Sequence, residues 1–430
     1  MNRVSKLFQP INKIPKSATI KHKEITSKSQ RLMLDLGIIK LASPGTFHLL
    51  PLGVRALEKL KSFIDKEMHK INAQKLALPA LTQAELWEKS GRLNNSAELF
   101  TVTDRHKNLY ILSPTHEEAI TDLLASIAPL SYKNFPLRLY QITSKYRDEM
   151  KTRFGLMRGR QFLMKDLYTF DIDMKNAEQT YSEVIKGYEN IFNTIGIDFN
   201  QVLAATGNIG GLISHEFHYT ADVGEDKLLF CLNCNYKGNV EVSGMDYCPQ
   251  CKSNKIMVKN GIEVAHTFLL GDKYSKPLNA TYLDRNGLTA NLQMGCYGLG
   301  ISRLLGAAVE VLSLEQELRW PLILAPYKVV IISPKAGSKE EAFTLGFDQE
   351  LYDNIDQLDG YAGNVLLDDR NHLTIGKRHL EARRMGYPYV IVIGSKATGS
   401  TPLYEINEIV TNKQHLLDRN ELLQYFRSIQ

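Results

Sequence analysis

The sequence predicts two folded parts, an α+β domain on an antiparallel sheet followed by a smaller α/β domain. At 430 residues the chain is longer than one hydrophobic core usually fills. Residues 138–147 and 161–170 alternate like strands around a short Gly- and Arg-rich stretch, as an antiparallel pair would. From about residue 326, apolar β-branched runs alternate with helical patterns, which is typical of an α/β domain with a partly parallel sheet.

The first thirty residues are basic, with seven Lys or Arg against one acid, Glu24. The formal net charge of the whole chain is +5, so the rest of the chain is close to neutral, and overall basicity does not indicate a nucleic-acid partner. Residues 1–30 resemble a mitochondrial presequence, or transit peptide, which predicts a location in the mitochondrial matrix. The alternative is a disordered basic tail. Apolar residues recur there at helical spacing: Val4, Leu7, Phe8, Ile11 and Ile14.

No run of about 18 uncharged apolar residues occurs, so we expect no membrane-spanning helix. Four of the five cysteines are clustered, which favours a metal site in a reducing compartment over a disulfide framework. The expected helices, apart from those of the basic segment, cover residues 53–72, 81–90, 176–194, 338–355 and 372–384. Further strands are expected before Pro79 and over 108–114, with loops and irregular strands over 203–224.

The segment YRDEMKTRFGLMRGRQFLMKD carries the densest set of chemical groups. Arg147 and Glu149 should lie on one face of a strand, and Arg158 should return from the hairpin beside Phe162. Guanidinium groups pair with phosphate, a carboxylate can hold a metal ion or an amine, and an aromatic ring can stack on a base. On local composition alone, a charged surface hairpin remains the alternative.

Two further motifs offer binding groups. In MGCYGLGISR, glycines precede an apolar helix, so a phosphate could approach the backbone near Arg303; a tight strand-to-helix joint explains the glycines equally well. In SPTHEE, Thr115 and Glu117 could together hold an ammonium or imino group. The alternative for SPTHEE is a capped helix start. The two histidines of HEFH, at 215 and 218, are three apart where a zinc protease needs four, so we reject that function.

A cysteine-rich segment at about 226–262 has the spacing of a tetrahedral zinc site. We expect a closed structural site, because four protein ligands leave no position for a catalytic water. Reduced thiols of a degenerated site are the alternative. The four ligands would be Cys231, Cys234, Cys248 and Cys251.

In this order, the motifs resemble those of a class II aminoacyl-tRNA synthetase of the prolyl type, from the bacterial and mitochondrial branch. GVRALEKL through Pro79 resembles motif 1, YRDE…RGRQF…KD resembles motif 2, and GLGISR resembles motif 3. PGTFHLLPLG, LPALTQAELWEKSGR, SHEF, GDKYS, GCYGLGISR and LLDDR are similar to prolyl-type sequences. The resemblance covers nearly everything from residue 30 to the end and implies a class II catalytic domain over 31–325 and an anticodon-binding domain over 326–430.

The resemblance also implies a reaction and its residues. The chain would ligate L-proline to tRNA(Pro), a reaction that uses ATP and Mg²⁺ and passes through prolyl-adenylate. Arg147 and Arg303 would be catalytic. The implied ATP-binding residues are Arg147, Glu149, Arg158, Phe162 and Arg303. The implied proline-binding residues are Thr115, Glu117, Arg147, Phe170, His215 and Cys296.

The resemblance further implies a homodimer that packs through the motif 1 helix, and no editing domain, because the long insertion of bacterial relatives is missing. Basic residues of the last hundred are expected to contact tRNA: Arg370, Lys377, Arg378, Arg383 and Arg384. For Arg383 and Arg384 a solvated helix face is the alternative. Two other functions stay open. One is a non-catalytic accessory subunit that binds nucleic acid, which would have lost the ATP-binding arginines. The other is a threonyl-type synthetase, whose His and Cys zinc ligands we do not find at matching motifs.

Overall fold

A computed structural model describes residues 1–10, 25, 27–95, 98–127, 129–344 and 346–429. The chain forms two compact units. One contains residues 41–47 and 60–311, and we call it the catalytic unit because it carries the candidate site. The other contains residues 1–40, 48–59 and 312–430, and we call it the C-terminal unit. Helices α2 (Pro51–Lys70) and α7 (Ile301–Leu312) have residues in both units.

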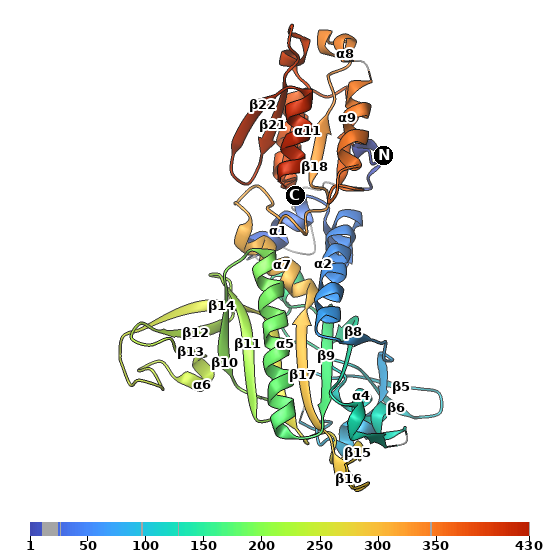
Figure 1. The fold of residues 1–430 in the computed structure, drawn as a ribbon, viewed down its shortest axis with the longest axis vertical. Coiled ribbons are helices and arrows are strands. Elements are labelled where there is room, and N and C mark those ends of the chain that lie inside the picture. The colour runs from blue at the N-terminus through green and yellow to red at the C-terminus, as the bar shows by residue number, and fades with distance from the viewer. Residues whose placement is uncertain (11–24, 26, 96–97, 128, 345, 430) are drawn as a thin grey trace. The chain divides into compact units, whose positions relative to one another are not determined.

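A nine-stranded sheet forms the centre of the catalytic unit (Figure 1). Its long central strands pair antiparallel, which confirms the predicted sheet type and the hairpin of residues 138–147 with 161–170. In sheet order the strands are β11 (Ile213–Thr220), β10 (Phe199–Ala204), β13 (Lys237–Asn239), β12 (Asp226–Cys231), β14 (Ile256–Gly271), β17 (Gln293–Gly300), β9 (Gln161–Asp171), β8 (Leu137–Tyr146) and β3 (Gln74–Lys75).

The side chains of strand β9 alternate between the two faces of the sheet. Successive side chains of a strand point to opposite sides. Phe162, Met164 and Asp166 face a cavity, whereas the intervening Lys165 reaches Tyr188 of the long helix α5 (Met174–Ile195). Helix α5 therefore covers the face opposite the candidate site, and Asp173 caps its first turn by accepting a hydrogen bond from the Asn176 backbone.

Small elements complete the catalytic unit. Residues 203–224 contain a loop and strand β11, as expected, and the pairing of β11 with β14 shifts register between Phe217 and His218. The other strands are β1 (Ile39–Ser43) with β2 (Thr46–Leu49), β4 (Leu81–Gln83) with β6 (Leu109–Leu112) and β5 (Phe100–Thr103), and β16 (Thr289–Asn291) with β15 (Thr281–Leu283) and β7 (Leu130–Ser131). The short helices are α3 (Ala84–Lys89), α4 (Glu117–Ala125) and α6 (Val240–Ser243).

The C-terminal unit has the expected α/β organisation. Strand β18 pairs parallel with β19 and β20, and the sheet then continues antiparallel through β21 and β22. The strands are β19 (Val365–Asp368), β18 (Val329–Ile332), β20 (Tyr389–Val392), β21 (Tyr404–Glu408) and β22 (Lys413–Leu417). The helices are α1 (Lys28–Asp35), α8 (Lys339–Phe343), α9 (Phe347–Asp356), α10 (Ile375–Met385) and α11 (Arg419–Ser428).

Two expectations for this unit are wrong. The helix expected over 338–355 is two helices, α8 and α9, because Gly346 adopts a left-handed conformation with φ of 77° between them. Arg378 is fully buried and donates hydrogen bonds to the carbonyls of Asp368 and Ser333, so it supports the fold and cannot contact tRNA. Lys377 beside it is exposed, because neighbouring residues of a helix face different directions.

The first ten residues contact the edge of this sheet. The Leu367 backbone N–H donates to the carbonyl of Asn2 at 2.9 Å, and Arg3 forms a parallel bridge with Leu367. The Ser5 hydroxyl donates to Asp369 at 2.6 Å. Much of the expected presequence, residues 11–24 and 26, lies outside the described residues.

Helix α2 confirms the predicted amphipathic helix. Its apolar residues Leu60, Ile64 and Met68 are completely buried within one chain. That stripe is therefore not free to cover a second subunit, contrary to the expected dimer contact, although Val54 on the same helix stays 41% exposed. Among the described helices, none combines the length and the apolar composition that a membrane crossing requires.

Candidate active site

A cavity of about 500 Å³ opens on the face of the sheet opposite α5, and the strands β9, β14 and β17 form its floor. One end is lined by Arg147, Glu149 and Arg303. The other end is lined by Thr115, Glu117, Arg92 and Cys296. A smaller hollow of about 250 Å³ continues past the arginine end and adds Phe154, Arg158 and Glu225 to the lining. The fold thus joins three motifs that lie far apart in the sequence.

The arginine end is prepared for an anion. Arg147 lies beyond the end of β8 rather than within a strand, and its backbone N–H donates to the Arg160 carbonyl at 2.9 Å. Its guanidinium carbon lies 5.2 Å from the centre of the Phe162 ring. Burial lowers the pKa of Arg147, and the positive charge of Arg303 lowers it further. Among the described residues no carboxylate forms an ion pair with Arg147, so a bound anion would relieve this repulsion.

Arg303 is held in place by its neighbours. As expected from GLGISR, it projects from the first turn of α7. Its Nε donates to the Met157 carbonyl at 2.8 Å, and its Nη1 donates to Glu263 at 2.7 Å. The glycines before it serve both predicted purposes. Gly298 and Gly300 line the cavity, whereas a Cβ on Gly295 would lie 2.7 Å from Thr169 Oγ1, so that position is needed for packing.

Arg158 and Glu149 form the outer wall of the arginine end. Arg158 Nε donates to Glu149 at 3.0 Å, and its Nη1 donates to Glu225 at 2.7 Å. Arg158 remains about one third exposed, and its pKa is raised because the two carboxylates outweigh the opposing effect of burial. These contacts bring Arg147, Glu149, Arg158 and Phe162 together as the sequence predicts.

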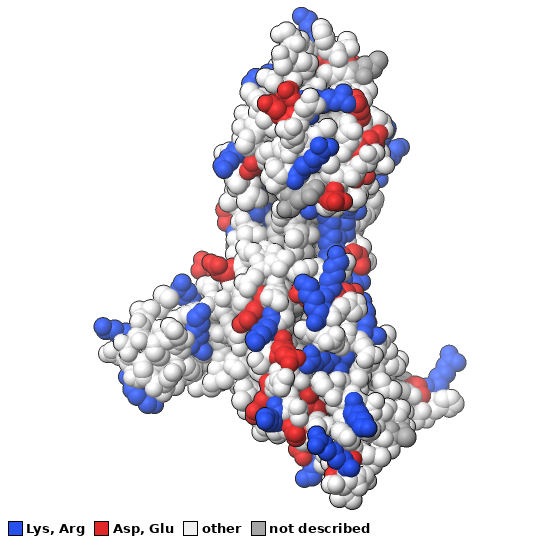
Figure 2. Space-filling view, in the orientation of Figure 1, with Lys and Arg blue, Asp and Glu red and all other residues white. Residues whose placement is uncertain are grey.

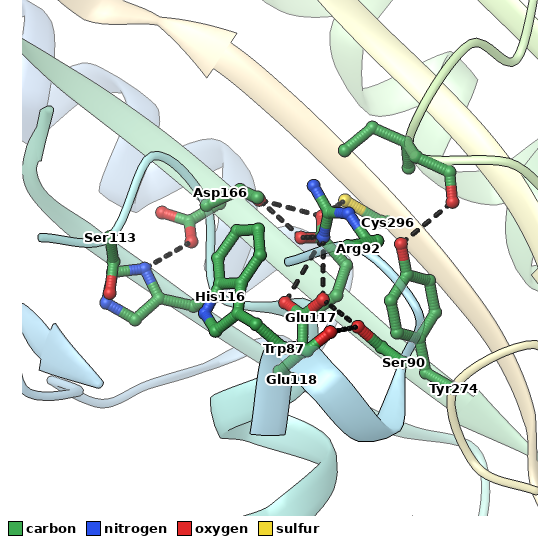
Figure 3. A network of polar contacts seen from close by, with 12 residues as sticks. Trp87, Ser90, Arg92, Ser113, His116, Glu117, Glu118, Asp166, Tyr274 and Cys296 are labelled. Atoms are coloured by element: carbon green, nitrogen blue, oxygen red, sulfur yellow. Dashed lines mark hydrogen bonds and ion pairs between the residues drawn. The ribbon is translucent and has the colours of Figure 1, made fainter. Parts of the chain in front are cut away.

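The carboxylate end centres on Glu117, which is completely buried and begins helix α4 (Figure 3). The Thr115 hydroxyl lies 2.6 and 2.8 Å from the two oxygens of Glu117, and the Cys296 thiol donates to the carboxylate at 2.9 Å. Arg92 Nη1 lies 3.2 Å from it. SPTHEE is a helix start, the alternative considered for this motif, and Thr115 and Glu117 also lie side by side at the cavity wall.

A buried polar network fixes the loop before Glu117. Asp166 accepts hydrogen bonds of 2.9 Å from Lys145, Gln141 and Tyr168, and the Tyr168 hydroxyl accepts the backbone N–H of His116. His116 Nε2 lies 3.0 Å from the carbonyl of Pro79, which can only accept, so Nδ1 is left to accept from Lys145 at 2.7 Å. Burial lowers the pKa of His116 to about 4, and Lys145 acts in the same direction. The imidazole is therefore neutral at pH 7.

Two residues expected near proline do not line the cavity. Phe170 lies on the same face of β9 as Asp166 but further along the strand, where it packs in the core with Ile120, Leu124 and Met294. His215 points to the other face of its strand and contacts the Tyr181 hydroxyl at 2.8 Å. Strand alternation brings its neighbour Glu216 to the cavity instead, with His266 and Phe268 from β14.

The residues behind Thr115 and Glu117 carry no local signal in the sequence. Arg92 belongs to the WEKSGR segment and His116 to SPTHEE, but no local spacing links them to Asp166 or Lys145. A second group, formed by Glu216, Glu263 and His266, has ligand atoms within 4.8 Å of one another in the cavity wall. Burial raises the pKa of Glu263, but the hydrogen bond to His266 and the charge of Arg303 outweigh it, so the carboxylate stays ionised.

The four cysteine side chains of the cysteine-rich segment lie close together, outside the cavity. Their sulfur atoms all lie within 4.8 Å of one another, with Cys231 and Cys251 3.5 Å apart and Cys234 and Cys248 3.6 Å apart. Tetrahedral zinc with Zn–S bonds of about 2.3 Å needs sulfur atoms about 3.8 Å apart. The donor set and its geometry therefore fit zinc. Figure 2 shows Lys or Arg side chains around the rim of this projecting arm, which β12, β13 and α6 form.

Comparisons with known proteins agree with this arrangement. The family "tRNA synthetase class II core domain (G, H, P, S and T)" matches residues 100–312, and "Anticodon binding domain" matches residues 328–429. The fold also resembles the solved Giardia lamblia prolyl-tRNA synthetase in complex with prolyl-adenylate, with a TM-score of 0.77 at 17% identity over 93% of this chain and 76% of that one. Fold and site thus define a class II tRNA synthetase core with an anticodon-binding domain.

Relatives of higher sequence identity show which family within this class the chain belongs to. The human protein "Probable proline–tRNA ligase, mitochondrial" is 48% identical over 410 residues, 94% of this chain and 86% of the relative. The Schizosaccharomyces pombe protein of the same name is 39% identical over 412 residues, covering 94% of each. The chain belongs to the proline–tRNA ligase family.

Proposed function

We propose that this chain ligates L-proline to tRNA(Pro) in two steps. The proline carboxylate attacks the α-phosphorus of ATP, which forms prolyl-adenylate and releases pyrophosphate, and the prolyl group then passes to the 3′-terminal adenosine of the tRNA. One observation carries the proposal: a single cavity has an anion site at Arg147 and Arg303 and a cation site at Glu117 and Thr115. Proline carries both charges, and ATP brings more negative charge to the arginine end.

In this proposal Arg147 binds the α-phosphate and the proline carboxylate, so it neutralises charge where the new bond forms. Arg303 binds the γ-phosphate, Phe162 and Arg158 hold the remainder of the ATP, and Glu149 orients Arg158 through their 3.0 Å contact. Little covalent help from the protein is needed, because in-line positioning and charge neutralisation supply most of the rate.

At the other end, Glu117 and Thr115 bind the ring nitrogen of proline, and Cys296 forms part of the wall of the pocket. Phe170 supports this wall from the core rather than touching the substrate, and His215 acts through Tyr181 and the strand that carries Glu216. Both were expected to bind proline directly. Within the proposal they are structural residues.

Metal ions enter the proposal in two places. Glu216 and Glu263 offer carboxylate oxygens of the kind Mg²⁺ prefers, close to Arg303, and Mg²⁺ there would neutralise phosphate charge.

The four-cysteine group would hold a structural Zn²⁺. The test for zinc is metal analysis of the purified protein together with its melting temperature. Cys231→Ser should lose one zinc and melt several degrees lower, whereas the surface change Lys255→Ala should alter neither, because Lys255 is exposed; a wild-type protein without zinc contradicts the site.

The proposal includes tRNA binding by residues 326–430, a homodimer and a mitochondrial matrix location. Lys377 is exposed and Arg383 is paired with Glu317, so Lys377 is the stronger candidate for a phosphate contact.

The dimer must use surface outside the buried stripe of α2. The location follows from the names of the relatives and from the basic N-terminal segment. Cleavage of that segment would remove the contacts of Asn2 and Ser5 with the C-terminal sheet, so the mass of the protein purified from mitochondria tests it.

We also propose that the enzyme does not correct alanine mischarging. A missing methylene is worth only about 1–3 kcal/mol of discrimination, so alanine can enter a proline pocket. The described chain between β9 and β17 consists of the catalytic fold and the cysteine-rich arm, and a closed zinc site offers no water to activate.

The decisive test is proline-dependent exchange of pyrophosphate into ATP by the purified protein, with threonine and alanine as alternative substrates. Exchange with proline alone, or far above the other two, is expected. Threonine-dependent exchange would favour the threonyl-type alternative, and no exchange with any amino acid would favour the accessory subunit. The retained pair Arg147 and Arg303 argues against the accessory function.

A further inference from the structure

Two buried glutamates share one arginine at the carboxylate end of the cavity (Figure 3). Arg92 Nη1 lies 3.2 Å from Glu117 and 3.0 and 3.2 Å from the two oxygens of Glu118. The exposed fractions of Arg92, Glu117 and Glu118 are 6%, 0% and 1%. Ser90 also donates to Glu118 at 2.7 Å. We call Arg92, Glu117 and Glu118 the triplet; fully ionised, it carries one negative charge in excess.

The surrounding groups do not cancel this charge. Lys145 is paired with Asp166 at 2.9 Å, and His116 is neutral. Lys273 donates to the Ile209 carbonyl and forms no ion pair with a described carboxylate. Tyr274 and Cys296 also face the triplet, and burial raises the pKa of each, so both are neutral. Within the described chain, Arg92 is the only cation at ion-pair distance from Glu117 or Glu118.

An uncompensated buried charge is costly, and a carboxyl group avoids this cost by keeping its proton. Glu118 is the better placed of the two to do so. Thr115 and Cys296 donate hydrogen bonds to Glu117, in addition to the contact with Arg92, and these stabilise its ionised form. Glu118 lies behind it and does not line the cavity. Burial raises the pKa of Glu118 and the charge of Glu117 raises it further, against the lowering effect of Arg92.

We propose that Glu118 is a positioning residue that holds a proton in the free enzyme and releases it when proline binds at Glu117. The inference rests on the proposed function. The O–H bond of the Glu118 carboxyl group breaks, the proton passes to the buffer, and the secondary ammonium of proline keeps both of its protons and donates them to Glu117 and Thr115. The bound ammonium then balances the triplet, which becomes neutral as a whole.

Two consequences follow for ligand binding. Below the pKa of Glu118, each unit of pH lowers the affinity for proline about tenfold, because a proton competes with the ammonium. A ligand without the cation should not displace the proton. Tetrahydrofuran-2-carboxylate has the shape of proline with oxygen in place of the ring nitrogen. It should bind more weakly than proline and release no proton.

Calorimetry of proline binding in buffers of different ionisation enthalpy counts the protons released. Across pH 5 to 8, proton release by the wild-type protein should be largest at the acid end and should fall as pH rises through the pKa of Glu118. Glu118→Gln keeps the carbonyl that accepts from Ser90 and Arg92 but carries no titrating proton, so its release should be near zero. Asp171→Asn is the matched control: Asp171 is buried, burial raises its pKa to about 6, and it lies outside the cavity, so this variant should release as much as wild type.

The pH dependence of the KM for proline distinguishes a loss of the titrating group from a structural defect. Glu118→Gln should raise the KM for proline about tenfold at pH 8 and leave it independent of pH, so that the variant and wild-type values converge as pH falls below the pKa of Glu118. Proton release by Glu118→Gln equal to wild type, or no release by wild type over this pH range, overturns the inference. If the variant does not fold, equal release on binding proline and tetrahydrofuran-2-carboxylate to wild type overturns it. Failure to activate proline at all would instead overturn the proposed function.

Discussion

The ionised groups at the two ends of the cavity leave opposite charges uncompensated, positive at the arginine end and negative at the carboxylate end. At the arginine end, Arg147 and Arg303 repel each other, and Arg147 has no ion-pair partner among the described carboxylates. At the carboxylate end, Glu117 and Glu118 share the single charge of Arg92. In the proposed function each end is completed by a ligand of the opposite charge. A zwitterionic amino acid beside a polyphosphate meets both requirements at once, which explains why the protein's own ionised groups balance neither end.

The largest effect is expected at the arginine end. Arg147→Ala should lower proline-dependent pyrophosphate exchange by about 10²–10³-fold, roughly 3–4 kcal/mol, because the charge that develops on the α-phosphate loses its partner inside the cavity. Both substrates touch this residue in the proposal, so kcat should fall. Arg153→Ala is the control, since Arg153 is half-exposed and lies outside the cavity lining. Near-normal exchange by folded Arg147→Ala would remove the assigned role.

The carboxylate end should respond differently. Glu117→Gln keeps the size of the side chain but removes its charge, so the KM for proline should rise by about 10–100-fold, while the KM for ATP stays within about twofold. The separation of the two KM values is the informative measurement. An equal rise in both would mean that the two ends do not divide the substrates as proposed.

More of the arginine end than of the carboxylate end could be predicted from the sequence. The grouping of Arg147, Glu149, Arg158 and Phe162 was predictable because one short hairpin holds all four close together, although Arg147 and Glu149 lie beyond the end of β8 and not on a strand face as expected. The support of the other end was not, since Arg92 lies 25 residues before Glu117 and Lys145 lies 29 residues after His116. His215 was misplaced for a related reason. Its motif was recognised, but which face of the strand it occupies depends on pairing with β14.

The network behind Glu117 makes its own contribution to stability. His116 is buried with a pKa lowered to about 4, so the fold favours neutral imidazole. This stabilisation is complete above the pKa of an unfolded histidine, near 6.5, and is lost as pH falls toward 4. Between pH 7 and pH 5 it should decrease by about 2 kcal/mol. Denaturant unfolding of wild type and His116→Gln at both pH values measures it, and the two proteins should differ less at pH 5. A constant difference would contradict a neutral, buried His116.

The smallest effect is expected at the outer wall of the arginine end. Arg158 is about one third exposed, and Glu149 and Glu225 already balance its charge, so its attraction for a further anion is reduced by both partners and by solvent. Arg158→Ala should therefore raise the KM for ATP only about threefold to fivefold and leave the KM for proline unchanged. The effect should shrink as ionic strength increases, more than that of Arg147→Ala, because charges at the exposed wall are screened more strongly than charges inside the cavity. Measuring both variants at low and high salt tests this gradient. A loss for Arg158→Ala as large as for Arg147→Ala would show that the phosphates extend further out than the cavity geometry implies.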